Sequence, residues 1–134
     1  MISIIVGCGV GIIAVILFFW LVGFKIIPND RVGIVEKWWS PKGSLKEQII
    51  ALNGEAGYQP DLLRGGIHFK SPLLYKVHTV PLVTVPQGKI AYVFARDGES
   101  LEATQTLGRI VKESNNFQNV RAFLQNKGQK GPQQ

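Results

Sequence analysis

The feature that most constrains this chain is an uninterrupted apolar run near its N-terminus. Residues Ile2 to Phe24 contain no charged side chain, and fifteen of these 23 residues are Ile, Val, Leu or Phe. A helix of this length rises about 34 Å, against about 30 Å of hydrocarbon in a bilayer. Insertion of those side chains is favourable by at most about 5–9 kcal/mol. The run therefore predicts one transmembrane helix, which we expect Pro28-Asn29-Asp30 to end.

Aromatic and basic residues near the exit of this helix predict contacts with the membrane interface. Trp20 lies close to the exit, where an amphipathic indole ring suits the interface, and Lys25 follows the run directly. Trp38 and Trp39 come shortly afterwards in the chain. This pair has two equally plausible positions, one in the membrane interface and one in the core of the following domain.

Two glycines predict a packing surface on the helix itself. Gly7 and Gly11 form a Gly-x-x-x-Gly pair, which permits close approach of two helices in lipid. Glycine is also common in membrane helices, so the pair indicates helix packing without requiring it. Cys8 lies between them as a small packing residue, and as the only cysteine it excludes an internal disulfide.

Four other structures can produce an apolar head. A cleaved signal peptide is disfavoured, because the run is long, lacks a preceding basic residue and has no Ala-x-Ala-like site. A lipoprotein signal ending at Cys8 lacks basic residues too. Residues 2–14 imitate a strand that enters a G-x-G-x-x-A dinucleotide turn, but the following residues are apolar on every face instead of amphipathic. A buried core helix is disfavoured because the run is so long in so short a chain.

The charge of the chain lies outside this run. The formal net charge is +6 at pH 7, and basic residues are frequent between residues 25 and 46 while none precedes the run. The positive-inside rule then predicts a cytoplasmic C-terminal domain. A basic chain can also bind nucleic acid, but these residues are dispersed and not grouped on a face. Membrane lipids are therefore the expected partner, and nucleic acid is not.

The remainder of the chain carries several segments with β character. They are rich in β-branched and aromatic residues and are separated by turns that contain Gly or Pro. They are residues 31–39, a short strand within 65–72, 74–85 and 89–95. The last of these is the strongest strand prediction, and it follows a turn at Pro86-Gln87-Gly88. We expect an antiparallel or mixed sheet.

One or two short helices are expected beside the sheet. Ser44 to Glu47 has the form of a helix capping box, and residues 48–52 after it fit either a short helix or a strand. Asn116 is the expected N-cap of a later helix. One face of that helix carries apolar residues at helical spacing. They are Phe117, Val120, Phe123 and Leu124.

No combination of residues predicts catalysis. His68 and His78 have no acidic partner in a recognisable motif, and the serines lie in no nucleophile elbow. The chain has no phosphate-binding loop, and one cysteine with two histidines gives no zinc spacing. We therefore expect a non-enzymatic protein with no catalytic, cofactor-binding or metal-binding residues.

Three motifs in a fixed order carry a resemblance to a known family. They are Ile27-Pro28-Asn29-Asp30-Arg31-Val32-Gly33-Ile34-Val35, Leu63-Arg64-Gly65-Gly66-Ile67-His68-Phe69-Lys70-Ser71-Pro72 and Val85-Pro86-Gln87-Gly88-Lys89-Ile90-Ala91-Tyr92-Val93. With the membrane helix before them, they resemble the stomatin/prohibitin/flotillin superfamily, whose shared module is the SPFH or band-seven domain. Residues 53–59 and 123–133 resemble its bacterial flotillin-like branch. Arg64-Gly65-Gly66 departs from the family, which has a Pro-Gly pair there.

The resemblance implies a fold and a function. The fold is α+β, with an anchor over residues 1–25, an incomplete SPFH-like domain over 26–127 and a Gly/Gln/Lys-rich end over 128–134. The function is a scaffold in the bacterial cytoplasmic membrane that organises microdomains and, in its full-length form, homo-oligomers. The alternative is a membrane-anchored regulatory or binding subunit that acts on a membrane protease or a small membrane protein.

Overall fold

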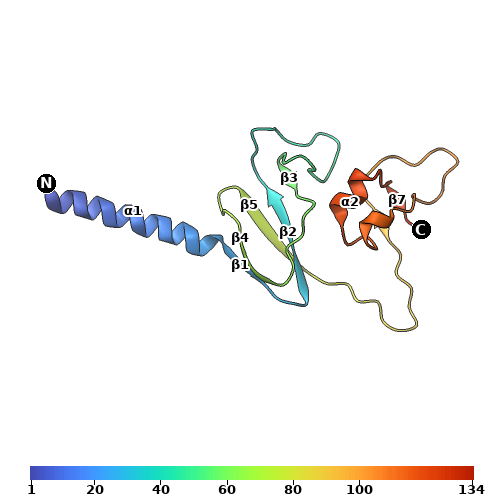
Figure 1. Ribbon diagram of the computed structural model, residues 1–134, viewed down its shortest axis with the longest axis horizontal. Helices are drawn as coiled ribbons and strands as arrows, with labels where there is room; N and C mark the ends of the chain where they lie inside the picture. Colours follow the sequence, from blue (N-terminus) through green and yellow to red (C-terminus); the bar gives the residue numbers. More distant parts are fainter.

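A computed structural model describes residues 1–134 of the chain. A single long helix, α1 (Ile2–Gly23), projects from a domain made of short strands and little helix (Figure 1). All strand pairs in the domain are antiparallel. The expected α+β class, with an N-terminal apolar helix followed by a β-rich domain, is confirmed.

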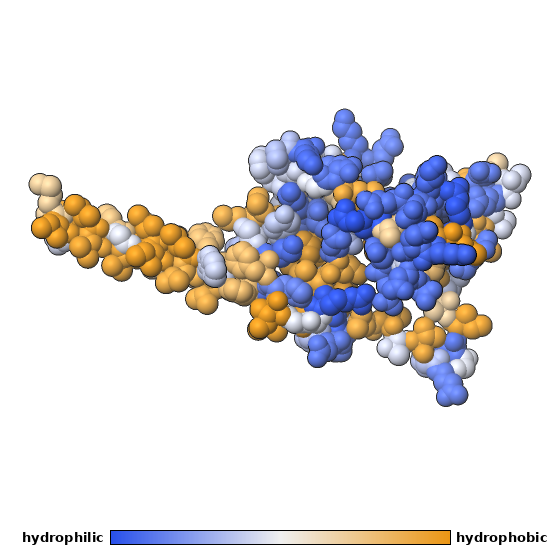
Figure 2. Space-filling model, in the orientation of Figure 1, coloured by the Kyte–Doolittle hydropathy of each residue, from blue (hydrophilic) through white to orange (hydrophobic).

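The helix α1 stands free of the domain over nearly its whole length. Only its last residue, Gly23, is buried, and Figure 2 shows apolar side chains along the length of the helix. A core helix would be mostly buried, so that alternative is wrong. The dinucleotide turn is also wrong, because residues 7–14 continue the helix without a break. By length and composition, α1 is able to cross a membrane.

The helix ends at Gly23, earlier than the expected stop at Pro28-Asn29-Asp30. Phe24 is already extended, with φ −76° and ψ 129°, and it begins strand β1 (Phe24–Ile27). This strand pairs with β4 (Gly66–Phe69), from Phe24 opposite Phe69 to Ile27 opposite Gly66. The pairing takes up the backbone hydrogen bonds that a longer helix would use. Pro28 and its neighbours instead form the turn into β2.

A three-stranded sheet forms the centre of the domain. Its order is β3 (Gly57–Tyr58), β2 (Arg31–Lys37) and β5 (Tyr75–Pro81). Strands β2 and β5 pair along their full length, from Arg31 opposite Pro81 to Lys37 opposite Tyr75. Pro81 lies at the end of an edge strand, where a missing N–H costs no ladder bond. The predicted strands at 31–39, 65–72 and 74–85 are confirmed with shorter bounds.

The apolar core is small. Its buried apolar residues come from strands β1 and β2, from the loop after β2 (residues 38–56) and from the C-terminal part (residues 94–134), and they are Ile27, Val32, Val35, Ala51, Ala56, Val111 and Phe123. Gly33 lies at the centre of β2, where a β-carbon would collide with the side chain of Ile27 and crowd those of Leu63 and Val77. The backbone of Gly33 also exchanges two hydrogen bonds with Leu63. Any larger residue here would force these neighbouring side chains to move.

The loop after β2 contains neither a helix nor a regular strand over residues 44–52. The expected capping box at Ser44 to Glu47 is therefore wrong. The N–H groups of Ile49 and Ile50 donate to the Asp97 carboxylate, at 3.1 and 2.8 Å. A helix would need these donors for its own carbonyls, so a contact with a residue far along the chain replaces it.

The strongest strand prediction, residues 89–95, is mostly wrong. Only Phe94–Ala95 form a strand, β6, and every residue from 81 to 94 is exposed. The predicted turn is present, since the Lys89 N–H donates to the Pro86 carbonyl at 3.1 Å. Residues 82–93 form a linker between β5 and β6, and Figure 1 shows that it extends away from β5. A strand needs a partner for its ladder, and residues 89–92 have none beside them.

The C-terminal part has short elements only. They are β6, the 3₁₀ turn η1 (Lys112–Ser114), helix α2 (Val120–Gln125) and β7 (Gly131–Pro132), which pairs with β6. The helix is capped by the Asn119 side chain, which accepts from the Ala122 N–H at 3.0 Å. Asn116, the expected cap, lies in a left-handed turn with φ 53°. The Gly/Gln/Lys-rich end packs into this part through β7 and the buried Gln129.

Candidate membrane interface

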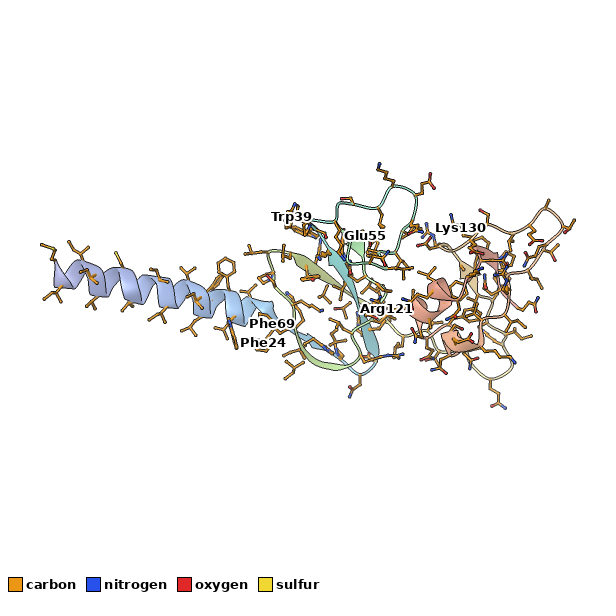
Figure 3. The ribbon with its side chains drawn as sticks, turned by 45° about the horizontal axis from the view of Figure 1, so that its top comes forward. Phe24, Trp39, Glu55, Phe69, Arg121 and Lys130 are labelled. Atoms are coloured by element: carbon orange, nitrogen blue, oxygen red, sulfur yellow. The ribbon has the colours of Figure 1, made fainter.

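Three aromatic rings meet where α1 enters the domain. Trp20 lies 6.0 Å from Phe24 and 5.7 Å from Phe69, and Phe24 lies 5.3 Å from Phe69, between ring centroids. These separations and tilts are typical of favourable aromatic pairs. Figure 3 shows Phe24 and Phe69 side by side at the end of the helix. The predicted interface residue Trp20 therefore belongs to a cluster that joins α1 to β1 and β4.

Two further contacts fix the last residue of α1 against the domain. The Lys70 N–H donates to the Gly23 carbonyl at 2.9 Å. A β-carbon on Gly23 would come within 2.5 Å of the Phe69 ring, so a larger residue would force this ring to move. Since Gly23 is the end of a helix able to cross a membrane, Phe69 and Lys70 lie at the same level as the helix exit.

Trp38 and Trp39 follow β2 and are both largely exposed, at 61% and 64%. Their placement in the domain core, one of the two predicted positions, is therefore wrong. The Trp38 N–H donates to the Leu74 carbonyl at 2.8 Å, which ties this pair to the turn between β4 and β5. Figure 3 places Trp39 on the side of the domain nearer to α1. Its location in the membrane interface stays a prediction.

The remaining predicted site residues are separate from this cluster. Lys25 lies in β1 opposite His68 and is partly buried. Gly7 and Gly11 lie in the far part of α1, are exposed, and have no atom within 4 Å of a β-carbon built on them. The helix surface around both glycines is therefore open to a neighbouring helix or to lipid, as the predicted packing surface requires.

A basic and aromatic group lies beside the same turn. The Nζ atoms of Lys37 and Lys70 lie 5.9 and 5.2 Å from the ring centroid of Tyr75, within the range of a cation–π contact. Lys37 also donates to the Gly54 carbonyl at 3.2 Å. Neither lysine belongs to a salt bridge of the structure. The group presents two positive charges outside any salt bridge, and at longer range the Lys70 charge acts on the Asp61 carboxylate.

Sequence reasoning missed most of this surface. Phe69, Lys70, Leu73, Leu74 and Tyr75 were expected only as strand and turn residues. A signal was present, because Leu73 and Leu74 form an apolar pair directly after Pro72, between the predicted strand within 65–72 and the body of the segment 74–85, where polar residues are usual. Their position beside the helix exit depends on the pairing of β4 with β1, which the sequence does not encode locally.

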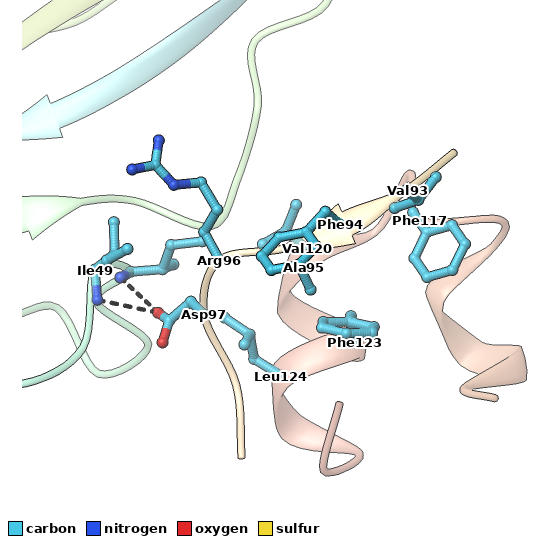
Figure 4. Close-up of a pocket in the computed structure, with 11 residues that line it drawn as sticks. Ile49, Val93, Phe94, Ala95, Arg96, Asp97, Phe117, Val120, Phe123 and Leu124 are labelled. Atoms are coloured by element: carbon cyan, nitrogen blue, oxygen red, sulfur yellow. Dashed lines mark hydrogen bonds between the residues drawn. The ribbon is translucent and has the colours of Figure 1, made fainter. Parts of the chain in front are cut away.

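A separate apolar cavity lies between the loop after β2 and the C-terminal part (Figure 4). Its volume is about 270 Å³, and most of its lining is apolar, including Phe94, Phe117 and Phe123. Asp97 is the acidic residue in its wall, and its carboxylate is occupied by the N–H groups of Ile49 and Ile50. Arg96 is the basic residue of the lining, and its guanidinium belongs to no salt bridge of the structure. The cavity therefore offers mainly apolar contact, with one positive charge in its wall.

The two histidines bond to different parts of the structure. Nε2 of His78 lies 2.8 Å from Glu36 on the neighbouring strand, with both side chains about one-third exposed. This long-range acidic partner was not visible as a sequence motif. Nε2 of His68 lies 2.6 Å from the Arg64 carbonyl. Neither contact aligns a histidine with a serine or cysteine nucleophile, and both fit strand and turn stabilisation.

Comparison of the chain with known protein families, curated proteins and solved structures finds no match.

Proposed function

We propose that this chain is a single-pass membrane protein with a non-enzymatic domain that acts as a scaffold for membrane microdomains and oligomeric assemblies. The observation that carries the proposal is the uncharged, exposed helix α1, which is built directly into the domain at Gly23. In water so much exposed apolar surface would be strongly unfavourable, whereas in a bilayer it is the stable arrangement.

The junction supports an anchor that is retained. Cleavage after α1 would remove Trp20 from its contacts with Phe24 and Phe69 and would free the Lys70 N–H from the Gly23 carbonyl. The basic residues that follow α1 support a cytoplasmic domain by the positive-inside rule.

The resemblance of the three ordered motifs to the stomatin/prohibitin/flotillin superfamily supports the scaffold role, with an SPFH-like domain of the bacterial flotillin-like branch. The open surface around Gly7 and Gly11 provides one route to self-association in lipid.

The second candidate is a membrane-anchored regulatory or binding subunit that acts on a membrane protease or a small membrane protein. The apolar cavity whose wall contains Asp97 favours this candidate, because such a cavity can accept one apolar side chain of a partner. The two candidates differ in whether the chain assembles with copies of itself.

The test is membrane fractionation of the full chain carrying a C-terminal reporter. We expect the chain to stay in the membrane pellet after an alkaline carbonate wash, at its uncleaved mass by mass spectrometry. Arginine in place of Ile13, near the helix centre, costs about 2.5–3.5 kcal/mol of insertion energy and should release protein to the soluble fraction. Ile13→Ala is the matched control. Recovery of the unaltered chain in the soluble fraction would overturn the proposal.

Native electrophoresis of the detergent extract then separates the two candidates. The chain is run as it is and fused at its C-terminus to a coiled-coil segment. A ladder or a large discrete species in the fused form supports the scaffold, and a strictly monomeric fused form favours the regulatory subunit. Protease protection in spheroplasts checks the orientation, since a cytoplasmic reporter stays intact.

A further inference from the structure

The turn between β4 and β5, residues 70–74, connects two points on the helix side of the domain. At one end the Lys70 N–H is bonded to Gly23, and at the other the Leu74 carbonyl accepts the Trp38 N–H. The turn is closed internally, because the Ser71 carbonyl accepts from the N–H groups of Leu74 and Tyr75 at 3.3 and 3.0 Å. In Figure 1 it lies on the side of the domain from which α1 projects.

The tip of this turn is apolar and unpacked. Leu73 is 67% exposed, and the neighbouring Trp38 and Trp39 are exposed to a similar extent. With Phe69 at the helix exit, they form an apolar surface that continues the surface of α1 onto the domain. Figure 2 shows apolar residues at this junction. Exposed tryptophan and leucine beside a membrane helix are side chains that the interfacial zone of a bilayer accommodates well.

The charge beside the turn has the sign that complements an acidic membrane. Lys37 and Lys70 both approach the Tyr75 ring and belong to no salt bridge. The Lys37 ammonium uses one donor on the Gly54 carbonyl, and each ammonium has further N–H donors that can bind an anion. They sit at the end of the sheet where β2 ends and β5 begins, next to the apolar tip. Phosphate groups of acidic phospholipids occupy the corresponding zone of a bilayer, just outside the acyl chains.

We propose that residues 70–74 and the Trp38-Trp39 pair form a second membrane contact, which inserts its apolar side chains into the bilayer that holds α1 and binds anionic phospholipid headgroups through Lys37 and Lys70. This inference rests on the proposed anchoring of α1. It adds that the domain lies against the membrane in one fixed orientation, with the linker and the C-terminal part turned away, and does not tumble on a flexible stalk.

The test uses the full chain in vesicles with a polarity-sensitive fluorophore on a single cysteine. Leu73→Cys in a Cys8→Ser background carries the label at the turn. Ile90→Cys in the same background is the matched control, because Ile90 is apolar and 97% exposed but lies in the linker before β6. Vesicles contain phosphatidylcholine alone or mixed with phosphatidylglycerol. We expect a blue shift and quenching by shallow lipid-borne quenchers at position 73, and neither at position 90.

The anionic contact is tested by paired charge changes. Lys37→Gln with Lys70→Gln should abolish the stronger signal seen with phosphatidylglycerol, since each lysine near an acidic surface shifts a docking equilibrium about fivefold. Lys89→Gln with Lys130→Gln removes the same charge elsewhere and should leave the signal unchanged. Equal loss in both pairs would overturn the proposed headgroup site.

Flotation of the labelled chain with the vesicles separates this inference from the proposed function. A chain that fails to float contradicts the anchor itself. A chain that floats while position 73 stays water-like contradicts the second contact alone. A shift at position 73 that grows with the protein-to-lipid ratio would assign the surface to a second copy of the chain or another protein surface, and would overturn the bilayer assignment.

Discussion

The sheet next to α1 and the C-terminal part are held together by different kinds of contact. Strands β2 and β5 pair over seven residues each, and β2 contributes Val32 and Val35 to an apolar core that also contains Ile27. Residues 94–134 have only two-residue strands, a three-residue 3₁₀ turn and a six-residue helix, and their buried residues include the polar Asp97, Ser114, Gln129 and Gln133. Side-chain hydrogen bonds there replace the backbone ladders of the sheet.

This difference predicts how each part responds to substitution. A ladder distributes its stability over many similar bonds, whereas a buried polar side chain with several partners concentrates it in one residue. Loss of such a residue leaves its former partners unsatisfied, which costs more than the bond itself contributed. Replacement of a single buried polar residue should therefore destabilise the C-terminal part most, whereas a change of side-chain volume should destabilise the sheet most.

The largest effect is expected at Gln129, which is 1% exposed. Its Oε1 accepts from Nε2 of Gln105 at 2.7 Å and from the Arg109 N–H at 2.9 Å. Gln129→Leu leaves the Arg109 N–H without this partner and removes both bonds between the Gln105 and Gln129 amides, while Gln105 Nε2 keeps its bond to the Leu107 carbonyl. We expect a loss of about 2–4 kcal/mol in the free energy of unfolding. Hydrogen exchange of residues 94–134 should rise, while exchange in β2 and β5 should not. The exposed Gln134→Leu is the control, and unchanged exchange in Gln129→Leu would contradict a polar core.

The second effect is expected at Gly33 in the sheet. Gly33→Val places side-chain atoms against Ile27, Leu63 and Val77, and overpacking of this kind costs about 1–3 kcal/mol. Tryptophan fluorescence during denaturant unfolding in detergent measures it, because Trp38 adjoins β2. Gly9→Ala, in an open part of α1, should leave the midpoint unchanged. A midpoint shift as large in Gly9→Ala would refute a volume effect specific to the sheet.

The third effect concerns the joint between the two parts. The Asp97 carboxylate accepts from the N–H groups of Ile49 and Ile50, so Asp97→Asn weakens two charge-assisted bonds. We expect a loss of about 1–2 kcal/mol and faster exchange of both amides. Glu102→Gln, an exposed change of the same kind, should have no effect. Protected amides at residues 49 and 50 in Asp97→Asn would show that the joint does not depend on this carboxylate.

The smallest effect is expected from the exposed ion pair between Asp61 and Arg121. Two bonds, at 3.2 and 2.7 Å, join these side chains, and the hydrogen bond from the guanidinium lowers the pKa of Asp61 below its ordinary 3.8. The pair should stabilise the fold above pH 3.8 and lose this contribution as the pH falls through the lowered pKa. Because the Asp61 side chain is 71% exposed, the contribution is about 0.2–1 kcal/mol.

The contribution of this ion pair is measured by unfolding the unaltered chain and Asp61→Asn as a function of pH. The difference in unfolding free energy should be constant near neutral pH and vanish in strong acid. Asp30→Asn is the control, since Asp30 belongs to no salt bridge. A difference that grows toward acid pH would have the wrong sign for a carboxyl group with a lowered pKa.

Some parts of the fold follow from local sequence and others do not. The helix over residues 2–23 and the strands at 31–37 and 75–81 follow from composition and periodicity, and the structure confirms them. Residues 89–95 have the same strand-forming composition but lie mostly unpaired in the linker. Composition indicates a preference for extended backbone, whereas a strand forms only where a second strand supplies its hydrogen bonds.

Some residues of the candidate membrane interface could likewise be predicted from the sequence, and others could not. Trp20, Lys25, Trp38 and Trp39 were accessible to sequence reasoning because aromatic and basic residues beside an apolar helix are typical of a membrane interface. The contribution of residues 69–75 was not, since these residues lie more than forty positions after the end of the helix. They reach it only because β4 pairs with β1.

The sequence alone determines that this chain carries one uncharged helix able to cross a membrane, because length and hydrophobicity are properties of a continuous segment. The tertiary structure alone decides where that helix ends and what surrounds its exit. Pairing of Phe24–Ile27 with Gly66–Phe69 ends α1 at Gly23 and brings Lys70 to its last carbonyl. Such long-range hydrogen bonds depend on which segments meet in space, and no local pattern records that.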